Sequence, residues 1–200
     1  MNKHSTIIDL IRHGEPEGGR MYRGHKDDPL SELGWRQMRE ATAHCNGWEK
    51  IVSSPLQRCA KFADELANER NVPLSIDEGF REICFGIWEG RAPADLEAEN
   101  PERMLAFWND PIANWPQGGE PFDQFQIRVA KAWEKLLREH TGQHLLLVAH
   151  GGVIRAILFH VLGIPPRNFF RLQVPYAAIT RLRADGNGKY PHLVFHSGRP

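Results

Sequence analysis

The chain alternates short apolar runs with stretches in which apolar residues recur at helical spacing. Between the first runs, Ser31 is a suitable N-cap for a helix that continues to about Cys45. Pro55 opens a second helix, because proline is favoured at the first helical position. This β-α-β-α-β order is typical of a parallel sheet with helices on its faces. The three apolar runs that predict buried strands lie at residues 5–11, 50–53 and 72–76.

The pattern changes between residues 77 and 121, where tryptophan and phenylalanine crowd a stretch rich in Pro, Asn and Gly. Short helices are expected at 93–99 and 101–108. We interpret residues 86–121 as an insertion or lid rather than a separate domain. The aromatic residues suit either a small core of this insertion or a surface that folds over a ligand.

The last third of the chain returns to the first pattern. A long amphipathic helix is expected at 122–137, then a strand that ends at His150 and a helix to about residue 162. Two strand-like runs, 178–183 and 190–196, are joined by Asp185-Gly186-Asn187-Gly188, which favours a hairpin. The sequence therefore predicts a single α/β domain over residues 1–200. Its fold would be a three-layer α/β/α sandwich with a mostly parallel central sheet, a helical insertion after the third strand and a C-terminal β-hairpin.

Composition excludes several classes of partner. The 200 residues are 41% hydrophobic and 25% charged, and 25 basic residues balance 25 acidic ones. A net charge of zero argues against nucleic-acid or membrane-surface binding, which needs a basic face. No apolar run approaches the roughly 20 residues of a membrane span, and the start lacks a signal sequence. Cys45, Cys59 and Cys84 are odd in number and lack CxxC spacing, so free thiols and a cytoplasmic protein are expected.

Two of the predicted strands run directly into His-Gly. Residues 7–11 lead into Arg12-His13-Gly14, and residues 145–149 lead into His150-Gly151. Ligands bind at the carboxyl ends of strands in open α/β sheets, so neighbouring strands would place His13 and His150 side by side. Arg58 follows another short strand. Each residue alone is more often structural, but two imidazoles and two guanidiniums at one edge favour a phosphoryl site.

A phosphatase also needs an acid for the leaving oxygen, and Glu82 is the candidate because it follows the third strand. A solvated loop carboxylate is an equally good interpretation of Glu82 on chemical grounds alone. Two histidines and a carboxylate can also bind zinc. The two arginines argue against a metal, since guanidinium groups repel a divalent cation, and we expect neither metal nor other cofactor.

Four motifs in chain order resemble the histidine phosphatase superfamily: Arg12-His13-Gly14, the segment from Ser53 to Arg58, the segment from Arg81 to Gly90, and His150-Gly151-Gly152. The resemblance implies the expected fold and a phosphohistidine mechanism. It implies His13 as nucleophile and Glu82 as proton donor. Phosphate would be bound by Arg12, Arg58, His150 and Gly151. Many members carry an asparagine seven positions after the first arginine, where this chain has Gly19.

The expected partner is a small phosphorylated metabolite. The run from Tyr22 to Met38 is similar to α-ribazole phosphatases, which makes α-ribazole 5′-phosphate a candidate substrate. The residues expected to contact the substrate are Tyr22, Arg23, Gly24, His25 and Trp88. A broad-specificity or sugar-phosphate phosphatase is the alternative. A phosphoglycerate mutase and an inactive phospho-ligand binding module fit the motifs less well. The sequence leaves the oligomeric state open, a homodimer included.

Overall fold

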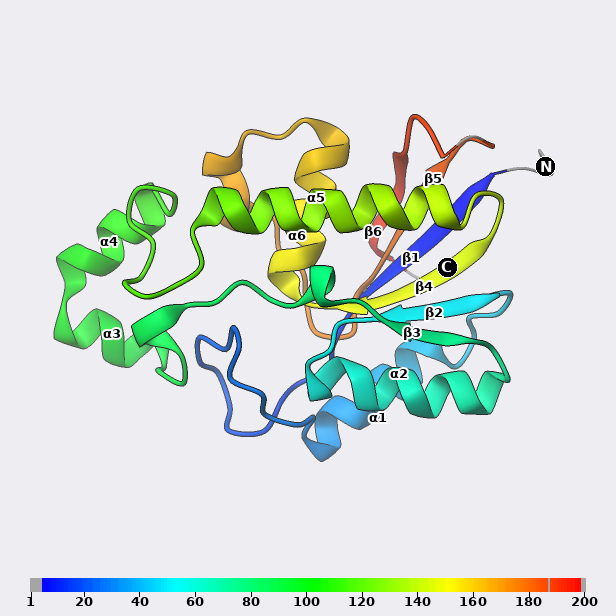
Figure 1. Ribbon diagram of the computed structural model, residues 1–200. Helices are drawn as coiled ribbons and strands as arrows, with labels where there is room; N and C mark the ends of the chain where they lie inside the picture. The colour runs from blue at the N-terminus through cyan, green and yellow to red at the C-terminus, as the bar shows by residue number, and fades with distance from the viewer. Residues whose placement is uncertain (1–4, 187, 199–200) are drawn as a thin grey trace.

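A computed structural model describes residues 5–186 and 188–198 of the chain. One six-stranded sheet has the order β3-β2-β4-β1-β5-β6 (Figure 1). Strands β1 to β4 pair in parallel, β5 runs antiparallel to β1, and β6 runs antiparallel to β5. The expected mostly parallel sheet with a C-terminal hairpin is thus confirmed. The strands are β1 (Thr6–Arg12), β2 (Lys50–Ser53), β3 (Leu74–Ile76), β4 (His144–Ala149), β5 (Ile179–Ala184) and β6 (His192–Gly198).

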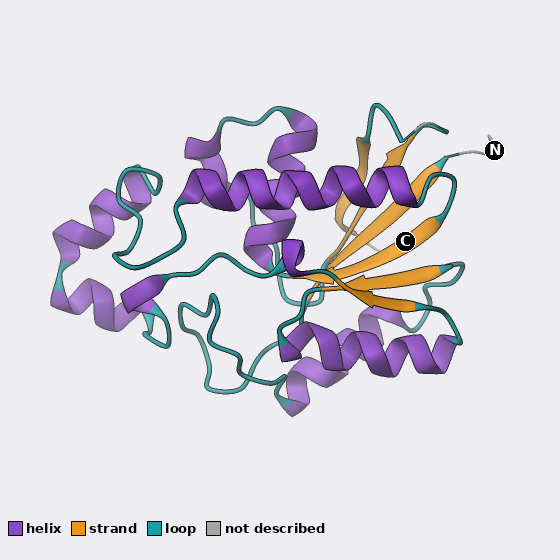
Figure 2. Cartoon of the chain, in the orientation of Figure 1, coloured by secondary structure: helices purple, strands orange, loops and turns teal. Residues whose placement is uncertain are grey.

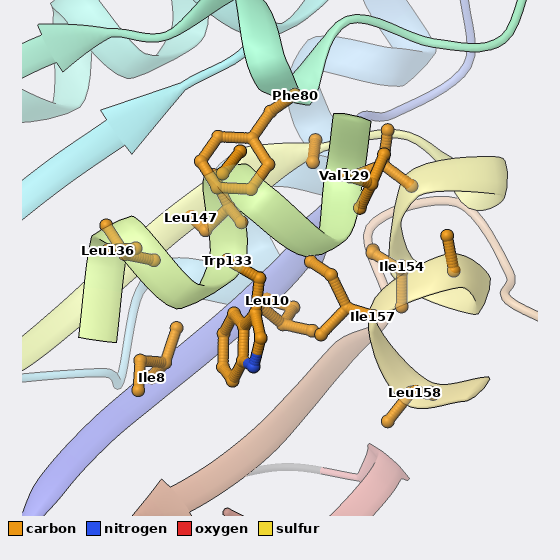
Figure 3. Packing of buried hydrophobic residues seen from close by; sticks show 14 of the residues in the cluster. Ile8, Leu10, Phe80, Val129, Trp133, Leu136, Leu147, Ile154, Ile157 and Leu158 are labelled. Atoms are coloured by element: carbon orange, nitrogen blue, oxygen red, sulfur yellow. The ribbon is translucent and has the colours of Figure 1, made fainter. Parts of the chain in front are cut away.

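Helices cover both faces of the sheet, as the β-α-β order predicts (Figure 2). Helices α1 (Glu32–Thr42) and α2 (Gln57–Arg70) pack on one face, and α5 (Phe122–Glu139) and α6 (Gly151–Leu162) pack on the other. Figure 3 shows the second layer, where Leu10, Trp133 and Ile157 are almost completely buried. Each such side chain stabilises the fold by roughly 1.5–3 kcal/mol through its burial.

The segment after β3 forms the expected helical insertion. It contains the short 3₁₀ helices η1 (Glu78–Phe80) and η2 (Gly86–Trp88), followed by α3 (Pro93–Glu99) and α4 (Pro101–Asn109). The Asn100 side chain caps α4 by accepting a hydrogen bond from the Arg103 amide. A third 3₁₀ helix, η3 (Pro166–Arg171), follows α6. The insertion has its own small apolar cluster, made of Tyr22, Trp88, Leu96, Met104 and Phe107.

Several element boundaries differ from the expected ones. Helix α2 begins at Gln57 rather than at Pro55. Helix α1 ends at Thr42 rather than near Cys45, and the Thr42 hydroxyl donates to the Met38 carbonyl at 2.9 Å. Strand β3 begins only after Pro73, since proline has no amide hydrogen for the ladder. The hairpin strands are shifted by one or two residues toward the C-terminus. Asn187 of the predicted hairpin turn lies outside the described residues.

No helix in the described ranges is long and apolar enough to span a bilayer. The three thiols are free, and those of Cys45 and Cys59 are buried.

Candidate active site

The parallel pairing of β1 with β4 brings the two His-Gly sequences together. Arg12 is opposite Ala149 in this pairing, so His13 and His150 leave the sheet at the same level. The His13 amide donates to the Ala149 carbonyl at 3.0 Å. The two imidazole centroids lie 5.2 Å apart, with the rings edge to face. The expectation that these strands are neighbours is therefore confirmed.

The His13 imidazole is held in one tautomer. Its Nδ1 lies 2.7 Å from the Gly14 carbonyl oxygen, which only accepts hydrogen bonds, so Nδ1 carries the proton. Burial, with the charges of Arg58 and Arg12, lowers the pKa of His13 well below its usual value of 6.5. A neutral ring with its proton on Nδ1 leaves the Nε2 lone pair available to a ligand.

His150 is fully buried and contacts the edge of His13. Its Nε2 and the Ser54 hydroxyl share a hydrogen bond of 2.6 Å, and the Cys59 sulfur lies 3.6 Å from the same nitrogen. Burial and the charge of Arg58 lower the pKa of His150 well below 6.5. His150 is therefore a neutral imidazole whose orientation is fixed, and it lies buried next to His13.

The two arginines are held in different ways. Arg12 donates from one terminal nitrogen to the Val174 carbonyl at 2.6 Å, and its guanidinium lies 4.1 Å from the Tyr176 ring centroid. Arg58 is fully buried and donates to the carbonyls of Arg23, Gly24 and Lys26 at 2.8–2.9 Å. The Nε atoms of Arg12 and Arg58 are both buried without a protein partner. Arg12 lines the cavity described below, so its Nε is a donor left for a ligand there.

Glu82 lies between the third strand and the insertion, and it is 8% exposed. One carboxylate oxygen accepts from the Gly152 amide at 3.0 Å, at the N-terminus of α6, and the other accepts from the Ile83 amide at 3.1 Å. These bonds aim the carboxylate at the start of the helix that follows His150. A helix N-terminus favours bound anions, so a phosphate there would lie beside Glu82.

Of the predicted catalytic and phosphate-binding residues, Arg12, His13, Glu82 and Gly151 line a cavity of about 530 Å³, whereas Arg58 and His150 are fully buried and do not line it. Of the expected substrate contacts, Tyr22 and Arg23 line it, whereas Gly24, His25 and Trp88 do not. The His25 side chain instead contacts the protein backbone, with its Nε2 3.0 Å from the Glu82 carbonyl oxygen. Arg155 and Tyr176 also line the cavity.

Gly19 also lines the cavity, with a φ of +75° and open space where a side chain would lie. Its carbonyl instead accepts from Arg23 at 3.1 Å, and Arg23 also donates to Asp28 at 2.7 Å. The guanidinium of Arg23 thus organises the loop in which other members carry asparagine. Arg20 from the same loop reaches the cavity wall.

Comparison with known proteins decides the family, because a model of the histidine phosphatase superfamily (branch 1) matches residues 8–196. The chain belongs to this superfamily. It is 30% identical to an adenosylcobalamin/α-ribazole phosphatase of Escherichia coli K12, over 82% of this chain and 83% of the relative. It is 34% identical to a glucosyl-3-phosphoglycerate phosphatase of Mycolicibacterium vanbaalenii, over 80% of this chain and 76% of the relative.

The fold agrees with solved structures as well. Bacillus stearothermophilus YhfR superposes with a TM-score of 0.87 at 27% identity, and the match covers 98% of both chains. Some curated relatives are longer. The chain spans about half (51%) of the length of a bifunctional protein of Mycobacterium tuberculosis, to which it is 32% identical.

Arg155 and Tyr176 are among the wall residues of this histidine phosphatase that the sequence did not predict. Arg155 lies one helical turn after Gly151, and this i, i+4 spacing is a signal that could have placed it near the site. Tyr176 comes from the loop before β5, far from every motif in the chain. Its position follows from backbone bonds, since the Ala177 amide donates to the Arg12 carbonyl at 3.0 Å.

Proposed function

We propose that this chain is a phosphomonoester hydrolase that acts through a phosphohistidine on His13. The observation that carries the proposal is the neutral, Nδ1-protonated imidazole of His13 at a cavity wall shared with Arg12 and Glu82. A nucleophile must keep a free lone pair, and the Gly14 carbonyl fixes the tautomer that provides it on Nε2.

In the first step, Nε2 of His13 attacks phosphorus and the bond to the ester oxygen breaks. The leaving oxygen takes a proton from Glu82, and Arg12 and the α6 amides stabilise the charge on the equatorial oxygens. In the second step, water gives its proton back to Glu82 and attacks phosphorus. The bond to His13 then breaks and inorganic phosphate leaves, so the enzyme returns to its starting state.

Rapid quenching with phosphorus-labelled substrate tests this mechanism. The wild-type protein should trap an acid-labile, base-stable phosphoprotein, and His13→Ala should trap none and lose turnover. Wild-type turnover in His13→Ala would overturn the mechanism. Release of inorganic phosphate without a bisphosphate primer separates this activity from that of a mutase.

Two substrate classes follow from the relatives. The α-ribazole 5′-phosphate proposed from the sequence is supported by the E. coli relative and by the aromatic wall that Tyr22 and Trp108 form. A phosphoglycerate ester is supported by the M. vanbaalenii relative. The rates of phosphate release from α-ribazole 5′-phosphate, a phosphoglycerate ester and simple sugar phosphates would rank these substrates. The free thiols support action in the cytoplasm.

A further inference from the structure

Arg155 is a positively charged residue in the cavity wall that has no role in the proposed hydrolysis. Its Nε donates to the Leu172 carbonyl at 2.7 Å. Its guanidinium lies 5.7 Å from the ring centroids of both Phe169 and Phe170. A carbonyl and two aromatic faces therefore fix the direction of the group, and they come from the segment after α6.

The terminal amino groups of Arg155 have no acceptor among the described residues. A Cβ atom built on Gly151 would lie 3.3 Å from Nη1 of Arg155 and 3.4 Å from Nε of Arg12. Both guanidiniums thus reach the glycine at which the phosphate-binding end of α6 begins. Burial lowers the pKa of Arg155 to about 10, against the opposing charge of Glu82.

The charge of Glu82 acts on Arg155, but an anion in direct contact would stabilise this partly buried guanidinium more strongly. The transferred phosphate already has the free Nε of Arg12 and the N-terminus of α6 at Gly151 to bind it. The fork of two terminal amino groups on Arg155 matches the two oxygens of a carboxylate. The apolar rings behind the fork strengthen such a pair by excluding water.

We propose that Arg155 forms a second anion-binding subsite, and that the substrate is a phosphomonoester with a carboxylate a few bonds from its phosphate. The inference rests on the proposed function and narrows its substrate class. It favours a phosphoglycerate ester over α-ribazole 5′-phosphate, because the latter has no carboxylate to pair with Arg155.

The test uses two substrates that differ only at this group. In 3-phosphoglycerate a carboxylate stands where glycerol 3-phosphate has a hydroxymethyl group. Wild-type protein should have the higher kcat/KM for 3-phosphoglycerate. Arg155→Gln should lower that value about ten- to hundredfold, the usual cost of losing a charge-assisted hydrogen bond, and change that for glycerol 3-phosphate less than about threefold. Arg155→Lys, which keeps the charge but not the fork, should lie between.

The ratio of the two rates within one variant does not depend on how much of it folds. An equal loss on both substrates would show that Arg155 binds the transferred phosphate or supports the fold, and would overturn the subsite. An unchanged ratio would overturn it too. Calorimetry with the His13→Ala variant measures the affinity for both compounds in the absence of turnover, and so tests the subsite independently of hydrolysis. Failure of the hydrolysis proposal would therefore be recognised separately.

Discussion

Gly152 offers a way to move Glu82 without changing it. Gly152 is the second residue of α6 and has ordinary helical geometry, so alanine is compatible with its backbone. A Cβ atom at this position would lie only 2.3 Å from Oε1 of Glu82 and 3.0 Å from its carboxyl carbon. Ordinary contacts begin near 3.4 Å, so in Gly152→Ala the carboxylate must retreat by about 1 Å.

This retreat lowers the rate of catalysis and costs some stability. A misplacement of about 1 Å can cost roughly 10²-fold in rate, and general acid catalysis is worth about 10²–10⁴-fold. Replacing glycine by alanine in a helix gains about 0.5–1 kcal/mol, which offsets part of the roughly 1.5–3 kcal/mol lost with the Gly152 to Glu82 hydrogen bond. The free energy of unfolding should therefore fall by about 0.5–2.5 kcal/mol.

The assay compares leaving groups. An alkyl phosphate needs a proton donor, whereas p-nitrophenolate leaves without one, so Gly152→Ala should cut kcat/KM about 10²-fold for the first and only slightly for the second. Glu82→Gln should show the same selectivity. The double variant should lose little more than either single one, because both act through one carboxylate. Equal losses on both substrates, or additive losses in the double variant, would refute a proton-donor role for Glu82.

Three further outcomes are expected. Tyr176→Leu should raise KM for phosphomonoesters about fivefold, because the Tyr176 ring, whose centroid is 4.1 Å from the Arg12 guanidinium, holds that group in place. Tyr176→Phe keeps the ring and should leave KM unchanged. Equal effects of the two variants in steady-state kinetics would contradict this role of the ring. Prolonged chelation should leave phosphate release unchanged, and loss that zinc or magnesium restores would indicate a metal site. His13 and His150 have pKa values lowered by folding, so protons bind the unfolded chain preferentially below pH 6.5. Denaturant titrations should therefore show stability falling from pH 7 to pH 5, less steeply in His150→Gln.

The sequence was informative about the site wherever a residue directly follows a strand. An apolar run fixes where a buried strand ends, and parallel pairing places the next residues of both strands at one edge. His13 and His150 satisfy both conditions, so the sequence alone predicts that they lie side by side. Glu82 was harder to place because a loop and η1 separate it from β3.

Contacts made by residues remote in the chain could not be predicted in this way. Tyr176 meets Arg12 across 164 positions of sequence only because β5 pairs with β1 and brings its preceding loop to the site. The orientation of Arg155 likewise depends on a carbonyl and two rings that follow α6. Periodicity assigns Arg155 to a helix face, but it does not say which atoms of other elements meet that face.

The aromatic insertion shows why composition does not separate a core from a ligand-binding wall. Trp88 is 4% exposed and packs on Tyr22 and Phe107, whereas Trp108 is 49% exposed and lines the cavity. Both tryptophans lie in the same segment and look equivalent in sequence. Their difference in exposure depends on tertiary packing, since Tyr22 from outside the insertion packs on Trp88, whereas Phe107 and Phe170 leave about half of Trp108 exposed. Composition does not contain this packing, so it cannot tell which aromatic ring is a core residue and which one faces the cavity.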